Sequence, residues 1–168
     1  AWNYRGCSQE LNRTLRFYHS GATDDLATVV EHAHSLGQYE EIFLIGFSLG
    51  GNLTLKYLGE KRSRPATLKK AAAFSVPLDL LSSCEKISQP SNWIYSQRFL
   101  KSLSKKVLNN STVMPGLDIS LLKKVKTLRE FDDYFTGPIH GFVDALDYYH
   151  QCSAIRFVHN IQLPTLLI

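Results

Sequence analysis

The stretch that decides the fold is "EIFLIGFSLGGNLTLKYLGE", residues 41–60. It begins with an apolar run of strand length that contains the β-branched residues Ile42 and Ile45. A serine between glycines follows, and after the glycines apolar residues recur at helical spacing. The stretch therefore predicts a strand, a tight turn at Ser48 and a helix.

The glycines around Ser48 meet the steric demand of a sharp strand-to-helix turn. In the Gly-x-Ser-x-Gly pattern of a nucleophile elbow, the serine has a strained backbone, and the residues two before and two after it must be small. Gly46 and Gly50 occupy these positions, and Gly51 lets the helix pack closely. The Leu49 amide, at the helix N-terminus, is then an expected donor to an oxyanion. The pattern predicts a nucleophile at Ser48, against the alternative of a glycine-rich turn with a solvated serine.

The segments on either side of this stretch alternate between helix and strand. Residues 21–37, "GATDDLATVVEHAHSLG", predict a helix with Thr23 as its N-cap and Gly37 as its C-terminal stop. Residues 71–80, "AAAFSVPLDL", predict a second buried strand, and "PTLLI" at 164–168 predicts the start of a third. This alternation favours an α/β fold whose first two strands are adjacent and parallel.

The alternation stops between the second and third predicted strands. Apolar residues near helical spacing predict a helical insertion there, in three stretches: residues 92–110, 118–135 and 141–155. We therefore expect a core segment at 1–79, a helical cap insertion at 80–160 and the start of the next core strand at 161–168. A strand buried on both faces needs neighbours, so the chain is expected to be an internal fragment of a larger domain. The basic and apolar residues of 93–108 also permit a membrane-surface helix, although a cap over an acyl pocket explains them better.

The composition fits one globular domain or part of one. The chain has 168 residues, 44% of them hydrophobic, and a formal net charge of +4. Its basic residues are dispersed, so nucleic acid is not an expected partner. Its three cysteines lack C-x-x-C spacing, which argues against a disulfide framework or a zinc site and favours the cytoplasm. No segment approaches the roughly 20 apolar residues of a transmembrane helix, and no metal or other cofactor is implied.

Four blocks in the right order resemble the YheT-like branch of the α/β-hydrolases. They are "NYRGCSQELNRTLRFYHSGATDDL" at 3–26, "GFSLGGN" at 46–52, "SVPLDL" at 75–80 and "FDDYFTGPIHGFVDALDYYHQCSA" at 131–154. Gln9 stands where that family usually has glycine and Leu11 where it has proline, which implies a first loop of different shape. The resemblance implies an α/β-hydrolase fold.

The same resemblance implies a serine carboxylester hydrolase that acts on a small-molecule or lipid ester. Its acyl-enzyme would form on Ser48, and the triad acid and histidine would follow Ile168. A second oxyanion donor would precede Ala1. Two alternatives stay open: an acyltransferase of the same fold, and a binding or scaffold protein that keeps the fold without turnover. The sequence does not indicate the oligomeric state.

Other candidate residues lie in the predicted insertion. His140, in "TGPIHGF", is flanked by glycines on an expected loop and could line the substrate entrance, but a structural role is the stronger interpretation of a lone histidine. Asp132 and Asp133 are expected either to pair with Arg5 or to cap the "YFTGP" turn. Too few ligands converge there for a metal site.

Overall fold

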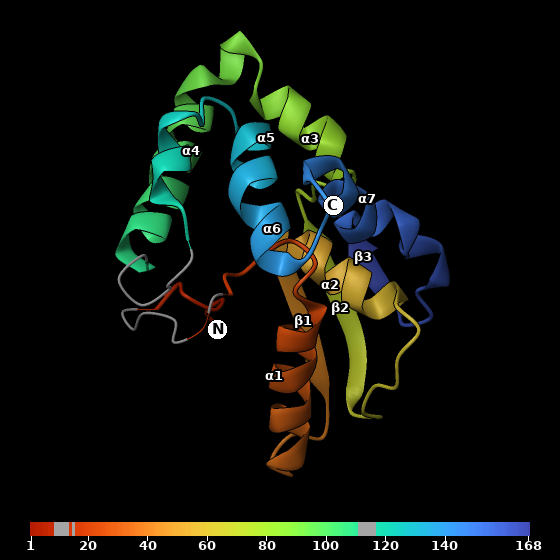
Figure 1. Ribbon diagram of the computed structural model, residues 1–168. Helices are drawn as coiled ribbons and strands as arrows, with labels where there is room; N and C mark the ends of the chain where they lie inside the picture. The colour runs from red at the N-terminus through yellow and green to blue at the C-terminus, as the bar shows by residue number, and fades with distance from the viewer. Residues whose placement is uncertain (9–13, 15, 111–116) are drawn as a thin grey trace. The chain divides into compact units, whose positions relative to one another are not determined.

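The computed structural model describes residues 1–8, 14, 16–110 and 117–168 (Figure 1). Gln9 and Leu11 therefore lie outside the described residues. The chain forms two compact units: the first consists of residues 1–19 and 81–150, and the second of residues 20–80 and 151–168. Residues 1–19 thus group with the helical part of the chain. The expected division into core, cap and next strand stays a prediction.

The second unit contains a three-stranded parallel sheet in the order β1-β2-β3 (Figure 1). The strands are Ile42–Phe47, Leu68–Phe74 and Thr165–Leu167. Gly46 lies opposite Ala73, and the pairs on either side keep the same parallel register. The two adjacent parallel strands expected from the sequence are confirmed, as is the third strand. Because all three run the same way, their carboxyl ends share one edge of the sheet.

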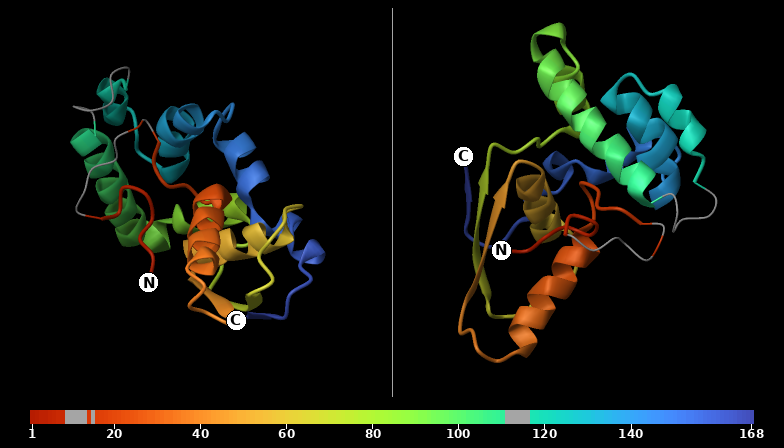
Figure 2. Two further views of the ribbon diagram at one scale, coloured as in Figure 1. Left: turned by 90° about the horizontal axis from the view of Figure 1, so that it is seen from below. Right: turned by 90° about the vertical axis from the view of Figure 1, so that its left-hand side faces the viewer.

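Two helices of this unit, α1 (Thr23–Ser35) and α2 (Leu49–Gly59), lie on one face of the sheet (Figure 2). Every residue of α2 from Gly51 onward is buried. A helix that is apolar nearly all round belongs in a core, since it has no face to offer to water. The helix that follows the serine is therefore a central element of its unit.

The ends of α1 test the capping predictions. The N-cap is Ala22 and makes no side-chain cap bond, so the expected N-cap at Thr23 is wrong by one position. Thr23 is already helical, and its buried hydroxyl accepts a hydrogen bond from Arg62 at 3.4 Å instead of capping an amide. Gly37 is the predicted stop, because it adopts a φ of 63° and its amide donates to the His34 carbonyl at 3.1 Å.

The first unit is built of helices around a core of Leu100, Val107, Phe131 and Phe135. The helical content expected between residues 80 and 160 is confirmed for the described residues. Its elements, which run on into the second unit, are α3 (Leu80–Ile87), η1 (Pro90–Asn92), α4 (Trp93–Asn110), η2 (Ile119–Lys123), α5 (Leu128–Phe131), the π-helical η3 (Asp132–Thr136), α6 (Gly137–His140), α7 (Ala145–Cys152), η4 (Ala154–Arg156) and η5 (Val158–Asn160).

Candidate active site

Ser48 lies at the turn between β1 and α2, with its side chain exposed. Its backbone has φ 50° and ψ −119°, a region that residues other than glycine rarely occupy. Three hydrogen bonds hold it there: its amide donates to the Phe74 carbonyl at 2.9 Å, and its carbonyl accepts from the amides of Gly51 at 2.9 Å and Asn52 at 3.1 Å. The expected order of strand, tight turn and helix is confirmed.

The glycines beside Ser48 are required by close packing. A Cβ atom on Gly46 would lie 2.4 Å from the Gly50 carbonyl oxygen. A Cβ atom on Gly51 would lie 2.5 Å from the Val76 Cγ2 atom. The first obstacle is backbone, which cannot move without opening the turn, so Gly46 sets how sharply the chain reverses after β1.

The N-terminus of α2 offers a positive end beside the serine. The amides of Gly51 and Asn52 donate to the Ser48 carbonyl, and the amide of Leu49 takes no part in these bonds. The first turn of α2 carries no acidic side chain that would offset the helix dipole. Negative charge that develops next to Ser48 would therefore meet a favourable field. The oxyanion role of Leu49 stays a prediction.

The histidines of the second unit do not lie near Ser48. His34 is 3.0 Å from the Thr67 hydroxyl, and Thr67 immediately precedes β2. Ser48 follows β1, which is parallel to β2 and six residues long, so the two sites lie at opposite ends of the sheet, roughly 20 Å apart. His32 lies in the same last turn of α1 as His34. None of these can reach the serine as a general base.

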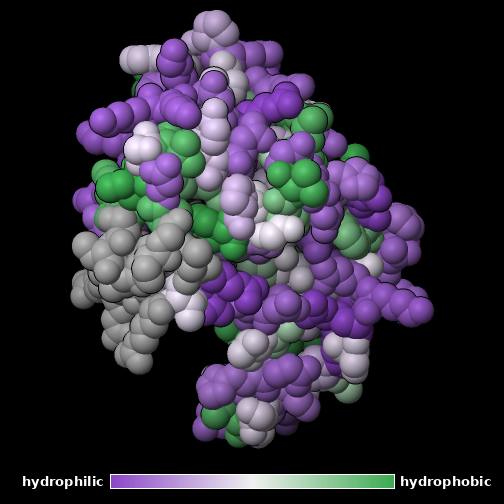
Figure 3. Space-filling model, viewed as in Figure 1, coloured by the Kyte–Doolittle hydropathy of each residue, from purple (hydrophilic) through white to green (hydrophobic). Residues whose placement is uncertain are grey.

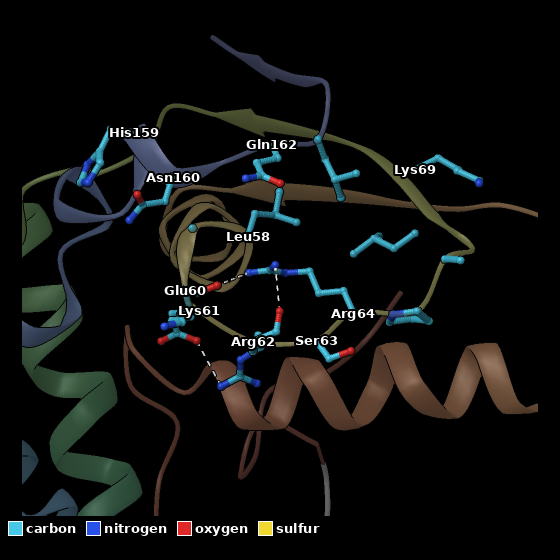
Figure 4. Close-up of a pocket in the computed structure, with 15 residues that line it drawn as sticks. Leu58, Glu60, Lys61, Arg62, Ser63, Arg64, Lys69, His159, Asn160 and Gln162 are labelled. Carbon is cyan, nitrogen blue, oxygen red and sulfur yellow. Dashed lines mark hydrogen bonds and ion pairs between the residues drawn. The ribbon is translucent and has the colours of Figure 1, made fainter.

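A hollow of the second unit is also distant from the serine (Figure 4). It has a volume of about 970 Å³ and is lined by residues that include Leu68, at the start of β2, and His159. Arg64 lies across it and donates to the carbonyls of Tyr57 at 2.5 Å and Glu60 at 2.6 Å (Figure 4). The Arg64 side chain therefore caps the last turn of α2. Because the hollow is distant from Ser48, it is not the candidate active site.

His140 is packed among aromatic rings of the first unit. Its ring centroid lies 4.4 Å from that of His19, which also contacts the rings of Phe142 and Tyr148. His140 lines a cavity of about 30 Å³, which is about the volume of one water molecule and too small for an ester. These contacts describe its packing, and a role at the substrate entrance stays a prediction.

Asp132 belongs to a hydrogen-bond network within the first unit. It accepts from the hydroxyls of Thr136 and Tyr149, both at 2.6 Å. Burial raises the pKa of its carboxyl to about 6, although the two hydroxyls act in the opposite direction. The bond to Thr136 joins Asp132 to a side chain of the "YFTGP" turn, but neither η3 nor α6 has a side-chain cap bond, so the expected capping of this turn by Asp132 is not found. Asp133 accepts from the Ala145 amide at 2.8 Å and so caps the start of α7.

Asn52 is an important residue that the sequence pattern did not reveal. Its side chain is fully buried and donates to the carbonyls of Ser20 at 3.0 Å and Cys152 at 2.9 Å. Its amide oxygen accepts from the Ala154 amide at 2.8 Å. The sequence offered little signal, because α2 also carries Thr54 and Lys56 and a polar residue in it is not unusual. Asn52 fastens α2, one turn after Ser48, to two chain segments that are distant in sequence.

Some classes of site and segment are absent from the described part of the chain. Across residues 1–8, 14, 16–110 and 117–168 no group of three or more histidine, cysteine or carboxylate side chains is placed to hold a metal ion. Within the same ranges, no helix has the length and apolar character needed to cross a bilayer.

A parallel sheet with a strained serine between a strand and a buried helix defines the class of protein. This arrangement is that of an α/β-hydrolase, which is the fold class predicted from the sequence. Comparison with known proteins agrees. The chain is 34% identical over 169 residues to YheT of Escherichia coli (strain K12), covering 99% of this chain and 49% of that protein. The resemblance to the YheT-like branch is therefore confirmed.

Two further relatives carry enzyme names. The chain is 34% identical to phospholipase ABHD3 of Bos taurus, covering 99% of this chain and 41% of that protein. It is 30% identical to the monoacylglycerol lipase of Saccharomyces cerevisiae, covering 97% of this chain and 38% of that protein. No family model matches the chain. The chain spans about half the length, or less, of the curated relatives it matches.

Proposed function

We propose that the protein is a serine carboxylester hydrolase in which Ser48 forms an acyl-enzyme with a small-molecule or lipid ester. The observation that carries this proposal is the strained backbone of Ser48 at the N-terminus of α2. Such strain is retained where the surrounding structure enforces it, and it is common at active sites. The names of the phospholipase and monoacylglycerol lipase relatives support an ester bond in a lipid as the group that is cleaved.

The proposed reaction assigns two groups of this chain. The Ser48 hydroxyl attacks the ester carbonyl carbon as its proton passes to a general base, and the Leu49 amide donates to the oxyanion of the tetrahedral intermediate. The base returns the proton to the leaving alcohol, and water then releases the acyl group by the same steps. The histidines of the second unit lie at the wrong end of the sheet, and in α/β-hydrolases the triad follows the chain order serine, acid, histidine, so we propose that the base and its acid follow Ile168.

A fluorophosphonate probe tests the nucleophile directly. We expect it to label the protein at Ser48, and we expect Ser48→Ala to abolish labelling and lower the turnover of p-nitrophenyl esters by on the order of 10⁴-fold or more. Ser63→Ala is a matched control, since Ser63 is an exposed serine on the distant hollow. Labelling that persists in Ser48→Ala would disprove the assignment.

The same experiment separates the alternatives. A scaffold protein would take up no probe at Ser48, although its fold would be intact. An acyltransferase would be labelled, but added alcohols would divert the acyl group from water to a new ester. Residues 1–168 alone should hydrolyse esters poorly even with Ser48 intact, because a serine without a base is a weak nucleophile.

A further inference from the structure

α4, the longest helix among the described residues, is basic and has no acidic side chain. It carries Arg98, Lys101, Lys105 and Lys106, and the sequence contains no aspartate or glutamate between Glu85 and Asp118. A helix on an ordinary solvated surface usually mixes both signs, which stabilise each other at i, i+4 spacing. The one-sided charge of α4 suits a partner that is negative.

The charges of α4 lie opposite its buried face. Leu100 and Val107 face the core, whereas Arg98, Lys101 and Lys105 are exposed and fall on the opposite side at spacings of three and four residues. In the described part of the chain these three cations have no carboxylate partner. The basic face of α4, defined as Arg98, Lys101 and Lys105, is therefore available to an external anion.

Large apolar side chains gather at the N-terminal end of the same helix. Trp93, Ile94 and Tyr95 are 62%, 76% and 67% exposed, and Phe99, one turn further on, is 50% exposed. In Figure 3 the upper end of the molecule, where α4 begins, is coloured hydrophilic to intermediate, as tryptophan and tyrosine are on this hydropathy scale, and the green atoms lie lower. Three consecutive exposed residues of this size form an apolar tip, defined as Trp93, Ile94 and Tyr95, next to the basic face.

A shallow hollow borders the basic face. It has a volume of about 410 Å³ and brings Lys101 of α4 beside Lys126, with Gln97 and Ser104 as further polar lining. Lys126 comes from the segment after η2, so the positive charge extends beyond the helix. Two ammonium groups and two polar side chains around an open hollow suit a phosphate group.

We propose that α4 docks the protein on an anionic lipid surface. The apolar tip enters the interface, where tryptophan and tyrosine are favoured, and the basic face binds the lipid phosphates. The combination of aromatic tip and basic face favours a bilayer over an acidic protein, because an acidic protein would satisfy the lysines and leave the tip in water. Docking of this kind does not depend on the proposed chemistry at Ser48.

The charge part of the proposal is tested by sedimentation of the full-length protein with vesicles. We expect binding to phosphatidylcholine vesicles that contain phosphatidylserine, weak binding to phosphatidylcholine alone, and loss of binding at high salt. Lys101→Ala with Lys105→Ala should weaken binding on the order of 20-fold. The matched control is Lys61→Ala with Lys69→Ala, which removes two exposed lysines from the second unit.

The apolar tip is tested separately. Trp93→Ala with Tyr95→Ala should weaken vesicle binding on the order of tenfold at unchanged charge, whereas Tyr39→Ala, an exposed tyrosine of the second unit, should not. Circular dichroism of each variant checks that it is folded. Ser48→Ala should bind vesicles normally, so a failure of the proposed function would not be mistaken for a failure of docking.

Three results would overturn the proposal. One is equal binding to vesicles with and without phosphatidylserine. Another is an equal loss in the control pair of lysines, which would indicate general charge. The third is full binding by the variant without Trp93 and Tyr95, which would leave a basic surface for an acidic protein or a free anion.

Discussion

At the scale of single residues, the backbone around Ser48 leaves little room for a larger side chain. Gly46→Ala would place a Cβ atom 2.4 Å from the Gly50 carbonyl oxygen, so the turn must open and Ser48 must move. Because displacements of about 1 Å can cost on the order of 100-fold in rate, we expect at least that loss in fluorophosphonate labelling. Gly37→Ala is the control: its Cβ atom meets nothing within 4 Å, and its positive φ should cost about 1 kcal/mol of stability without affecting labelling. Equal labelling of both variants would contradict this account.

Asn52 makes a second prediction at this scale. Asn52→Ala removes the partners of two buried carbonyls and one buried amide, so we expect the free energy of unfolding to fall by about 3 kcal/mol in urea titrations. Asn160→Ala, at an exposed position, should change it by less than about 0.5 kcal/mol. A loss for Asn52→Ala as small as that of the control would mean that water replaces the lost bonds.

The glycines around Ser48 and the side chain of Asn52 differ in how well their roles could be predicted from the sequence. The glycines at 46 and 51 could be predicted, because their constraint is local to the turn. Asn52 could not, because its partners lie 32, 100 and 102 positions away in the sequence. Its role appears only once distant segments are placed together.

At the scale of elements, the strands and the two helices of the sheet follow from apolar periodicity, because burial of a face or stripe determines both. The π-helical turn at Asp132–Thr136 does not, because its wider winding accompanies a tertiary contact, the Tyr149 hydroxyl on Asp132. The N-cap of α1 was predicted at the wrong residue for a similar reason, a tertiary contact. Thr23 has good capping chemistry, but its hydroxyl is buried beside Arg62.

The carboxyl of Asp132 should make the free energy of unfolding depend on pH. Its pKa is raised from 3.8 to about 6, so the folded state binds the proton more tightly than the unfolded state. This contribution to stability is fully present below pH 3.8 and is lost as the pH rises through about 6. Relative to Asp132→Asn, the native protein should lose about 3 kcal/mol of unfolding free energy across that window.

Urea denaturation at a series of pH values measures this difference. Glu85→Gln, which removes an exposed carboxyl on α3, should show the same pH dependence as the native protein. If Asp132→Asn and the native protein have parallel profiles, the carboxyl titrates near its ordinary pKa in spite of its burial.

At the scale of the whole molecule, the sequence predicted the class of fold and the presence of a helical insertion. We also expect the insertion to lie over the carboxyl ends of the strands, because ligands of open α/β sheets bind at that edge. Periodicity within a segment determines which side chains are buried, but it carries no information on how one compact unit meets another. The relatives are about twice as long as this chain or longer. Their similarity indicates the class of protein, which the periodicity of this chain alone does not.

The sheet itself makes the last prediction. α1 and α2 lie on one face of it (Figure 2). Phe43, Ile45 and Phe47 alternate along β1 and are 51%, 65% and 67% exposed, so they lie on the other face. Parallel sheets are normally covered on both faces, and an apolar patch of this kind drives association in water. Residues 1–168 expressed alone should therefore self-associate, as measured by light scattering at increasing concentration.

Ile45→Lys should reduce the association, because a charge at the centre of the patch must be desolvated when two copies meet. Tyr39→Lys, which adds the same charge at an exposed position before β1, should not reduce it. A monodisperse chain at high concentration would mean that this face is covered in solution by part of the chain itself.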